Sequence, residues 1–216
     1  MDQPLTSPAL RALDDAFHAM MEKSRAEPAA SLEVRCDRLA RLRSVVSDNE
    51  ARLSAAISAD FGNRSATETL FAEILFVLNE IKHASKHLRK WMAPQRIVTA
   101  LQFLPAKNRL VPQPLGVVGV IAPWNYPLQL TLAPAIGALA AGNRVMIKPS
   151  ELTPHFAALL KELVAAKFKP DELFVTGVED EVAKAFAALP FDHLVFTGST
   201  RSAGWSRKRQ GAISPP

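Results

Sequence analysis

Residues 116–148 decide the fold, and they read GVVGVIAPWNYPLQLTLAPAIGALAAGNRVMIK. The opening run, 116–122, is apolar and rich in valine, which is typical of a strand that is buried on both faces. A turn bounded by prolines leads to an apolar helix at 128–141, and a second strand follows at 144–148. Because a strand–helix–strand unit forms a right-handed crossover, this segment predicts two parallel strands in one sheet.

The C-terminal half continues the alternation of strands and helices. Helices are expected at 154–167 and 180–188, and strands at 173–176 and 193–197. Such alternation predicts an α/β fold with a Rossmann-like parallel sheet.

The N-terminal half has helical periodicity instead. An apolar stripe from residue 31 to about 60 predicts one long amphipathic helix, which Gly62 is well placed to end. A second stripe runs to Trp91 and begins with Ser65 and Glu68, which match a capping box. A further helix is expected at residues 8–25.

Between the two halves, apolar residues stand among prolines, which favours extended chain or a hairpin. We therefore expect four parts in the chain. They are a helical section (1–95), an extended segment (96–115), an incomplete α/β unit (116–201) and a tail (202–216).

The composition is that of an ordinary globular protein, with 48% hydrophobic and 22% charged residues in a chain of 216. The net charge of +5 raises the question of a nucleic-acid partner. Basic and acidic residues are interleaved, however, and the one dense basic cluster is 207–209, so no nucleic-acid partner is expected.

Two further features concern location and metals. No charged residue occurs between Arg109 and Arg144, but prolines interrupt this stretch, so no membrane span is expected. The single cysteine, Cys36, excludes an internal disulfide and a multi-cysteine metal site, and no metal is expected. Without a recognisable signal peptide, the sequence favours the cytoplasm.

Three segments follow predicted strands and carry unusual residues, namely 123–127, 148–151 and 196–200. Parallel sheets bind ligands beyond the carboxyl ends of their strands. In the first segment, Asn125 lies in a turn stiffened by two prolines, where a rigid carboxamide in a low-dielectric site could stabilise an oxyanion. The alternative is a turn residue that bonds its own backbone.

The other two segments suggest a nucleotide. Lys148 and Glu151 could hold ribose hydroxyls, since a strand-end acid commonly binds the adenosine ribose of NAD; the alternative is a surface ion pair. Gly198 and Ser199 would let the backbone approach a pyrophosphate. Neither a G-x-G-x-x-G motif nor a Walker A motif occurs, so the residues alone predict a dinucleotide-binding sheet and no more.

In order and spacing, the blocks PWNYP (123–127), GNRVMIKPSE (142–151) and FTGST (196–200) resemble signature segments of the aldehyde dehydrogenase superfamily. The resemblance runs from about residue 10 to Arg201. Details outside the three blocks look most like the bacterial coniferyl aldehyde dehydrogenases, a branch near the class 3 enzymes. They lie at residues 58–62, 87–92 and 189–193.

This resemblance implies a reaction and a set of site residues. A cysteine thiolate attacks the aldehyde, hydride passes to NAD or NADP, and a glutamate activates the hydrolytic water. Asn125 matches the oxyanion-hole asparagine, and Lys148 and Glu151 match the ribose pair. The other implied cofactor-binding residues are Ile121, Pro123, Trp124, Ser150, Gly177, Thr197, Gly198 and Ser199. Intact members form homo-oligomers, so a homodimer acting on a small, coniferyl-type aldehyde is implied.

The chain departs from the family pattern near its end. The family's nucleophilic cysteine and base glutamate lie beyond the 196–200 block and are not found here, while Cys36 is expected to be a core residue. We therefore expect no aldehyde oxidation by this chain and weak NAD binding at best. Residues 202–216 lose the family pattern, but GC-rich codons for them, read one base earlier, give Leu-Gly-Arg-Leu-Val and restore it. A one-base frameshift near codon 201 is the expected cause.

Three other hypotheses stay open. The chain could be a non-catalytic NAD-binding module, which saturable NAD affinity would support. It could be a basic interaction protein acting through residues 201–209, which salt-dependent binding of nucleic acid would support. Ser150 or Ser199 could be a nucleophile, although the sequence positions no His or Asp beside either. By the resemblance, the extended segment 96–115 belongs to the small oligomerisation sheet. In the family, later parts of the chain add strands to that sheet and to the cofactor domain, and without them exposed apolar surface and open strand edges are expected to favour aggregation.

Overall fold

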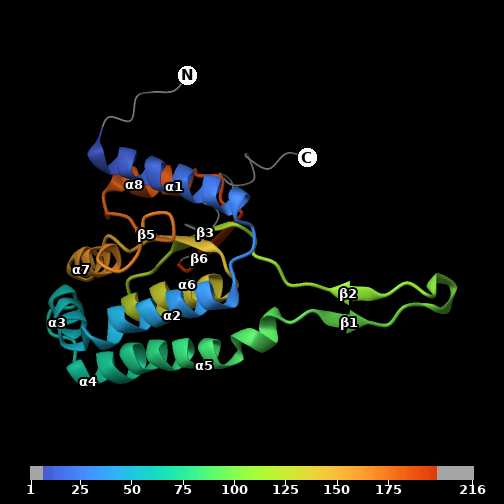
Figure 1. The fold of residues 1–216 in the computed structure, drawn as a ribbon. Coiled ribbons are helices and arrows are strands. Elements are labelled where there is room, and N and C mark those ends of the chain that lie inside the picture. The colour runs from blue at the N-terminus through green and yellow to red at the C-terminus, as the bar shows by residue number, and fades with distance from the viewer. Residues whose placement is uncertain (1–6, 199–216) are drawn as a thin grey trace.

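The computed structural model describes residues 7–198 and has a parallel sheet at its centre (Figure 1). Within that range the sheet contains four strands in the order β5-β4-β3-β6, and all neighbouring pairs are parallel. The strands are β3 (Val117–Ile121), β4 (Arg144–Lys148), β5 (Leu173–Val175) and β6 (His193–Phe196). The predicted α/β class is confirmed, and each predicted strand lies where the sequence pattern indicated.

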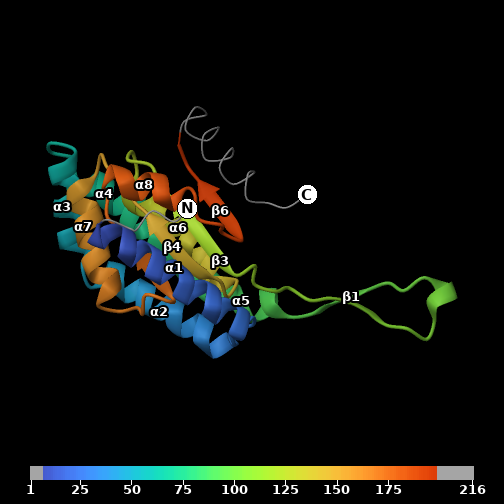
Figure 2. The same cartoon turned by 90° about the horizontal axis from the view of Figure 1, so that it is seen from above.

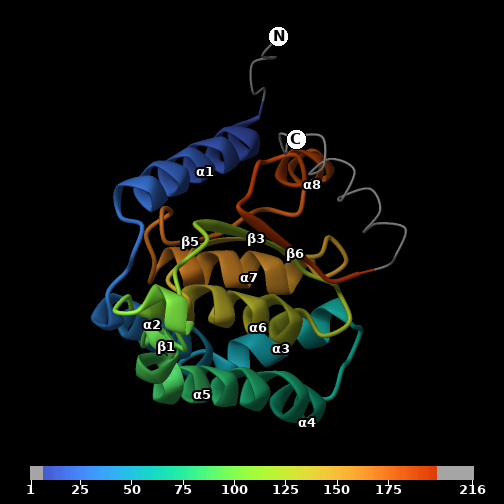
Figure 3. The ribbon, with the colours of Figure 1, turned by 90° about the vertical axis from the view of Figure 1, so that its right-hand side faces the viewer.

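Helices cover both faces of the sheet (Figure 3). On one face lie α1 (Pro8–Ala26) and α8 (Asp180–Phe186), and on the other lie α6 (Pro127–Ala140) and α7 (Pro154–Ala165). Each face has its own cluster of buried apolar side chains. This arrangement explains why β3 and β4 are apolar along almost their whole length, since neither face of the central strands meets water.

A further layer of helices packs outside α6 and α7 (Figure 3). It consists of α2 (Leu32–Ser47), α3 (Glu50–Asp60) and α5 (Leu75–Met92). Buried residues of these helices belong to the same hydrophobic cluster as the sheet residues that pack against α6 and α7. The N-terminal helices therefore share a core with the α/β unit, and the four-part division of the chain stays a prediction.

The predicted helix over residues 31–60 is wrong in one respect, because it is two helices. Asp48 and Asn49 separate α2 from α3, and the φ angle of Asn49 is −130°, outside the helical region. The Asn49 carboxamide donates a hydrogen bond to the Val45 carbonyl at 3.1 Å. Such side-chain bonds compete with the helix backbone, and the apolar stripe continues across the break.

The second long helix exists, but the predicted capping box does not form. Ser65 makes no side-chain bond to the helix start, and Glu68 pairs with Arg64 at 3.0 Å instead. The helix runs through α4 (Ala66–Thr69), one π-helical turn, η1 (Leu70–Ile74), and then α5. The π turn carries Glu73, which is fully buried.

A hairpin arm projects away from the layered body (Figures 1 and 2). Its strands β1 (Gln95–Ile97) and β2 (Asn108–Leu110) pair antiparallel, with a 3₁₀ turn, η2 (Leu101–Phe103), between them. Of the two forms expected for residues 97–115, extended chain or a hairpin, the structure has the hairpin, which begins at Gln95. The apolar side chains that the arm exposes are Ile97, Val98, Leu101, Phe103, Leu104, Leu110 and Val111.

Some expectations lie outside the described residues. They concern Ser199, the basic cluster at 207–209 and the tail with its proposed change of reading frame. These stay predictions.

Candidate functional site

The three unusual segments meet at one edge of the sheet because of the strand register. Ile121 pairs with Lys148 of β4 on one side and with Phe196 of β6 on the other. Backbone bonds continue this alignment past the strand ends, from the Thr197 nitrogen to the Ile121 oxygen at 3.1 Å and from the Ala122 nitrogen to the Lys148 oxygen at 3.0 Å. Residues far apart in the chain are thus brought together where a parallel sheet binds ligands.

An open cleft of about 820 Å³ lies at this edge. The residues predicted from the sequence that line it are Ile121, Pro123, Trp124, Asn125, Lys148, Ser150, Glu151, Thr197 and Gly198. Gly177 does not line it: an added Cβ there would lie 2.6 Å from the Glu179 carboxyl carbon, so that side chain covers Gly177. Ser199 is outside the described residues.

Sequence reasoning missed one wall of the cleft. Asp180, Ala183 and Ala187 line it from the side of α8. Leu130, Leu152 and Phe196 line it as well. Alanine carries no chemical signal in a sequence, and the approach of α8 to the strand ends is set only by packing, so no local pattern could have revealed this wall.

Lys148 and Glu151 form a close ion pair, with 2.6 Å between Lys148 Nζ and Glu151 Oε2. The Lys148 side chain is only 7% exposed, whereas that of Glu151 is 55% exposed. The hydrogen bond from Lys148 lowers the pKa of the Glu151 carboxyl, and it outweighs the opposing effect of burial. The Glu151 carboxyl is therefore ionised at neutral pH, and it lines the cleft rather than a plain surface.

The surroundings of Asn125 bear on the two interpretations that its sequence context allowed, an oxyanion donor and a residue that bonds its own turn. The residue is exposed at the cleft, so the expected low-dielectric environment is absent in the described chain. Its backbone oxygen accepts a hydrogen bond from Arg64 Nη1 at 2.8 Å. Its carboxamide bonds no residue between 7 and 198, and so it does not close its own turn but stays free to meet a ligand.

The helix starts at this edge already carry carboxylates. Glu73 Oε2 accepts hydrogen bonds from the backbone nitrogens of Leu128 and Gln129 in α6, at 2.6 and 3.2 Å. Asp60 likewise caps α7 at His155 and Phe156, with N···O distances of 3.0 and 2.9 Å. The first turn of α8 contains two acidic residues of its own. Because these charges occupy the positive helix ends, an anionic ligand is disfavoured at all three described starts.

Glu73 is the most enclosed of these carboxylates. It is fully buried, and burial raises the pKa of its carboxyl, although the two backbone bonds and the Arg64 charge oppose that rise. Arg64 Nη1 lies 3.4 Å from Glu73 Oε1. The guanidinium group that donates to the Asn125 carbonyl therefore also lies beside the Glu73 carboxylate that caps α6.

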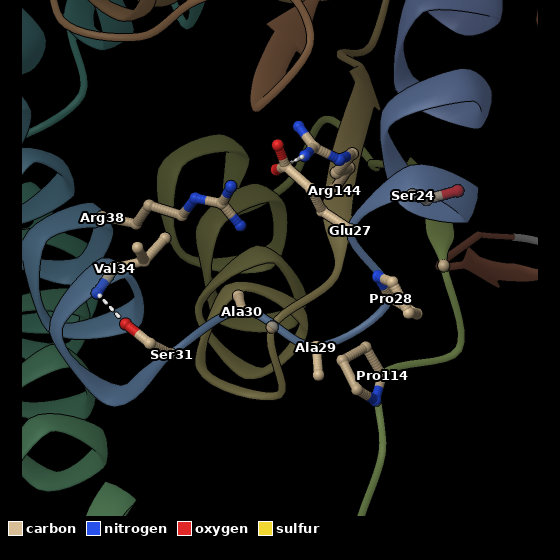
Figure 4. A pocket seen from close by; sticks show the side chains of 12 residues that line it. Ser24, Glu27, Pro28, Ala29, Ala30, Ser31, Val34, Arg38, Pro114 and Arg144 are labelled. Carbon is tan, nitrogen blue, oxygen red and sulfur yellow. Dashed lines mark hydrogen bonds and ion pairs between the residues drawn. The ribbon is translucent and has the colours of Figure 1, made fainter.

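A second, smaller cavity of about 190 Å³ lies at the opposite edge of the sheet (Figure 4). Loop residues 27–31 and the side chains of Arg38 and Arg144 line it. Arg144 is paired there, with Glu27 at 3.3 Å and with Asp171 at 3.1 Å. None of the predicted site residues lines this cavity, and it lies at the amino ends of the strands, so the larger cleft is the candidate site.

Other kinds of site have less support in the described part of the chain. Cys36 is half-buried and packs against the larger hydrophobic cluster, as predicted. Between residues 7 and 198 no group of three or more His, Cys, Asp or Glu side chains could hold a metal ion. No helix in that range is both long and apolar enough to cross a membrane.

Comparisons with known proteins point to one family. A family model described as the aldehyde dehydrogenase family matches residues 7–204. A probable coniferyl aldehyde dehydrogenase of Pseudomonas aeruginosa is 51% identical over 175 residues, which cover 81% of this chain and 37% of that protein. A coniferyl aldehyde dehydrogenase of a Pseudomonas species is 44% identical, with 88% of this chain and 39% of that protein covered. This chain therefore spans less than half the length of these relatives.

Solved structures agree with these sequence matches. Substrate-bound AldH of Staphylococcus aureus superposes with a TM-score of 0.89 at 31% identity, covering 93% of this chain and 43% of that one. A mutant of aldehyde dehydrogenase C from Pseudomonas syringae, in complex with NAD+ and octanal, gives a TM-score of 0.78 at 27% identity. It covers 95% of this chain and 41% of that one.

Proposed function

Because the chain belongs to the aldehyde dehydrogenase family, we propose that its cleft holds the adenosine half of NAD and that Asn125 supplies an oxyanion donor. The observation that carries the proposal is the Lys148–Glu151 pair, placed at a strand end inside the cleft. Glu151 would accept a ribose hydroxyl, and Lys148 would donate to one. When bound, the nicotinamide of the cofactor accepts a hydride from the substrate.

The charges of the cleft favour NAD over NADP. A 2′-phosphate on the adenosine ribose would lie beside the Glu151 carboxylate, and the two negative charges would repel each other. On the α8 side, Ala183 and Ala187 offer small side chains against which a flat adenine could lie. We therefore expect the 2′-hydroxyl form of the cofactor to bind better.

The pyrophosphate is best placed at the turn after β6. The starts of α6, α7 and α8 are occupied by carboxylates, whereas the backbone at Gly198 is a described part of the wall that carries no acidic side chain. An added Cβ at Gly198 would meet the ring of Phe196 at 2.6 Å, so this turn packs as closely as it does because it has no side chain. Bare backbone of this kind lets a phosphate group approach.

The substrate of the proposed function is an aldehyde, and the resemblance to coniferyl aldehyde dehydrogenases favours an aromatic one. Asn125 would donate its carboxamide N–H to the aldehyde oxygen as negative charge develops there. Cys36 is the single cysteine in the sequence and sits in a helix packed on the core, so it does not serve as the nucleophile. We propose that this chain alone does not oxidise aldehydes, and that the hairpin arm with its apolar side chains joins copies of the protein.

Titration of the chain with NAD+ tests the cofactor site, and calorimetry measures the affinity. The Glu151→Gln and Lys148→Met variants are each expected to weaken binding by about ten-fold, since each loses a hydrogen bond that involves a charged group. Glu162→Gln is the matched control, because Glu162 is an exposed glutamate of α7 whose described partner is Arg52. Equal affinity in Glu151→Gln and Glu162→Gln would refute the ribose assignment, and absence of saturable binding in the unmodified chain would refute the proposed cofactor site.

A further inference from the structure

We propose that Arg64 is a positioning residue that fixes the conformation of the 123–127 turn, with buried Glu73 as its counter-charge. The inference rests on the proposed function only for the role of Asn125 as a donor. The fixing of the turn is a property of the ligand-free chain and can be tested without any substrate.

Arg64 contacts the turn from outside the α/β unit. It lies in the loop between α3 and α4, more than fifty residues before the turn, and its side chain is only 5% exposed. Nη1 donates to the Asn125 carbonyl at 2.8 Å. The guanidinium carbon also lies 4.6 Å from the centre of the Tyr126 ring and 4.8 Å from that of Phe61. A planar, permanently charged fork can stack on rings and bond a carbonyl at the same time, which an ammonium group cannot do equally well.

Glu73 holds the other end of the same turn. One of its oxygens accepts the first free nitrogens of α6, at Leu128 and Gln129, while the other lies 3.4 Å from Arg64 Nη1. Arg64 and Glu73 thus form one buried unit that touches the turn at Asn125 and at the helix that follows it. Removing Arg64 would leave the buried Glu73 carboxylate uncompensated, whereas Arg64 itself also pairs with the half-exposed Glu68 at 3.0 Å.

A further contact of the turn runs through Phe61. Trp124 is half-exposed, with its ring centre 6.1 Å from that of Phe61. Phe61 in turn stacks on Arg64, so this contact also depends on the guanidinium group. Without Arg64, the Asn125 backbone would lose its bond and the Tyr126 ring would lose the guanidinium group. Phe61, which Trp124 contacts, would lose the same group.

The emission of Trp124 reports on the turn directly. In the full 216-residue chain, Trp91→Phe and Trp205→Phe leave Trp124 as the one tryptophan. In this background, Arg64→Met is expected to shift the emission to longer wavelength and to raise acrylamide quenching by up to about two-fold, since the ring is already 51% exposed. The backbone and side-chain amide signals of Asn125 in an NMR spectrum are expected to broaden or shift as well.

Arg52→Met is the matched control, because it removes an exposed arginine of α3 that pairs with Glu162. Chemical rescue separates positioning from a loss of folding. In Arg64→Ala, free guanidinium ion, far below denaturing concentrations, is expected to restore the Trp124 emission and the Asn125 signals, whereas methylammonium is not. Unchanged Trp124 quenching in folded Arg64→Met, or no recovery with guanidinium in Arg64→Ala, would overturn the proposal.

The same variants keep the two proposals apart. If the unmodified chain fails to bind NAD+ while guanidinium still restores the turn, the positioning role stands and the cofactor site falls. If NAD+ binds and Arg64→Met leaves the turn unchanged, the cofactor site stands and the positioning role falls.

Discussion

Glu172 is the residue at which charge most clearly stabilises the described structure. Arg41 donates to its carboxylate through Nη1 at 2.8 Å and Nη2 at 3.1 Å, and Arg38 Nε donates at 3.3 Å. Burial by itself would raise the pKa of Glu172, but the hydrogen bonds and charges of the arginines outweigh it and lower the pKa to about 2. These contacts tie α2 to the start of β5.

The stability of the chain is therefore expected to fall in acid. Since the folded-state pKa of Glu172 is below its ordinary value, the contribution is complete above about pH 4.5 and is lost as the pH falls towards 2. Glu172→Gln is expected to lower the free energy of unfolding by about 1 to 2 kcal/mol at pH 7, allowing for solvent screening. Urea titrations of both proteins at pH 7 and pH 3 measure this effect.

The difference between the two proteins should shrink at pH 3, where the native chain also begins to lose the charge. Glu162→Gln serves as the control, since its ion pair with Arg52 is exposed and should contribute little at either pH. A Glu172→Gln protein as stable as the native chain at pH 7 would show that this network does not stabilise the fold.

At the scale of single helices, the first turns of α6 and α7 are both capped by a carboxylate from another part of the chain. Both helices begin with proline, and the residue before each makes no side-chain cap. Carboxylates from the N-terminal helices supply the missing acceptors, Glu73 for α6 and Asp60 for α7. The capping box expected at Ser65 was wrong because Glu68 accepts a hydrogen bond from Arg64 instead of bonding the helix start.

Asp60→Ala is expected to destabilise the fold by about 1 to 2 kcal/mol, since it removes the cap of α7. The backbone nitrogens of His155 and Phe156 then have no side-chain acceptor. Thermal unfolding followed by circular dichroism measures the change. Asp37→Ala is the control, because Asp37 pairs with Arg41 at an exposed position and caps no helix. Equal melting temperatures for the two variants would rule out a cap from a distant helix as a source of stability.

At the scale of the whole molecule, we expect the hairpin arm to control association of the chain in solution. It stands clear of the layered body (Figure 2), and it exposes a run of large apolar side chains. The outer edge of β6 also has no neighbouring strand within residues 7–198. Apolar surface and open edges of this extent favour association.

We expect the chain to self-associate through the arm. Replacing Val98 and Leu101, which are 93% and 82% exposed, with glutamate is expected to reduce the associated fraction without changing the melting temperature. Sedimentation velocity over a range of concentrations measures the associated fraction. Gln95→Glu with Asn108→Glu adds the same charge to the arm but removes no apolar area, and it should have a smaller effect. Equal effects of the two pairs would mean that charge, rather than apolar contact, controls association.

Much of the fold follows from local pattern. The apolar runs within β3 and β4, the apolar helix between them and the prolines around the 123–127 turn each depend on neighbours in the chain. Each lies where the sequence predicted. Strand-end residues such as Lys148 and Glu151 could also be predicted to meet, because parallel strands align their carboxyl ends. The α/β class, the site edge and most of the cleft were thus determined by the sequence alone.

The rest was decided by contacts between residues far apart in the chain. The burial of Glu73 and the contact of Arg64 with Asn125 have no local signal, because each depends on which helix packs beside it. The same holds for the α8 wall, where two alanines matter only through their position against the strand ends. Propensity and periodicity act over a few residues, whereas packing joins residues more than fifty positions apart, and so only the tertiary structure could place them.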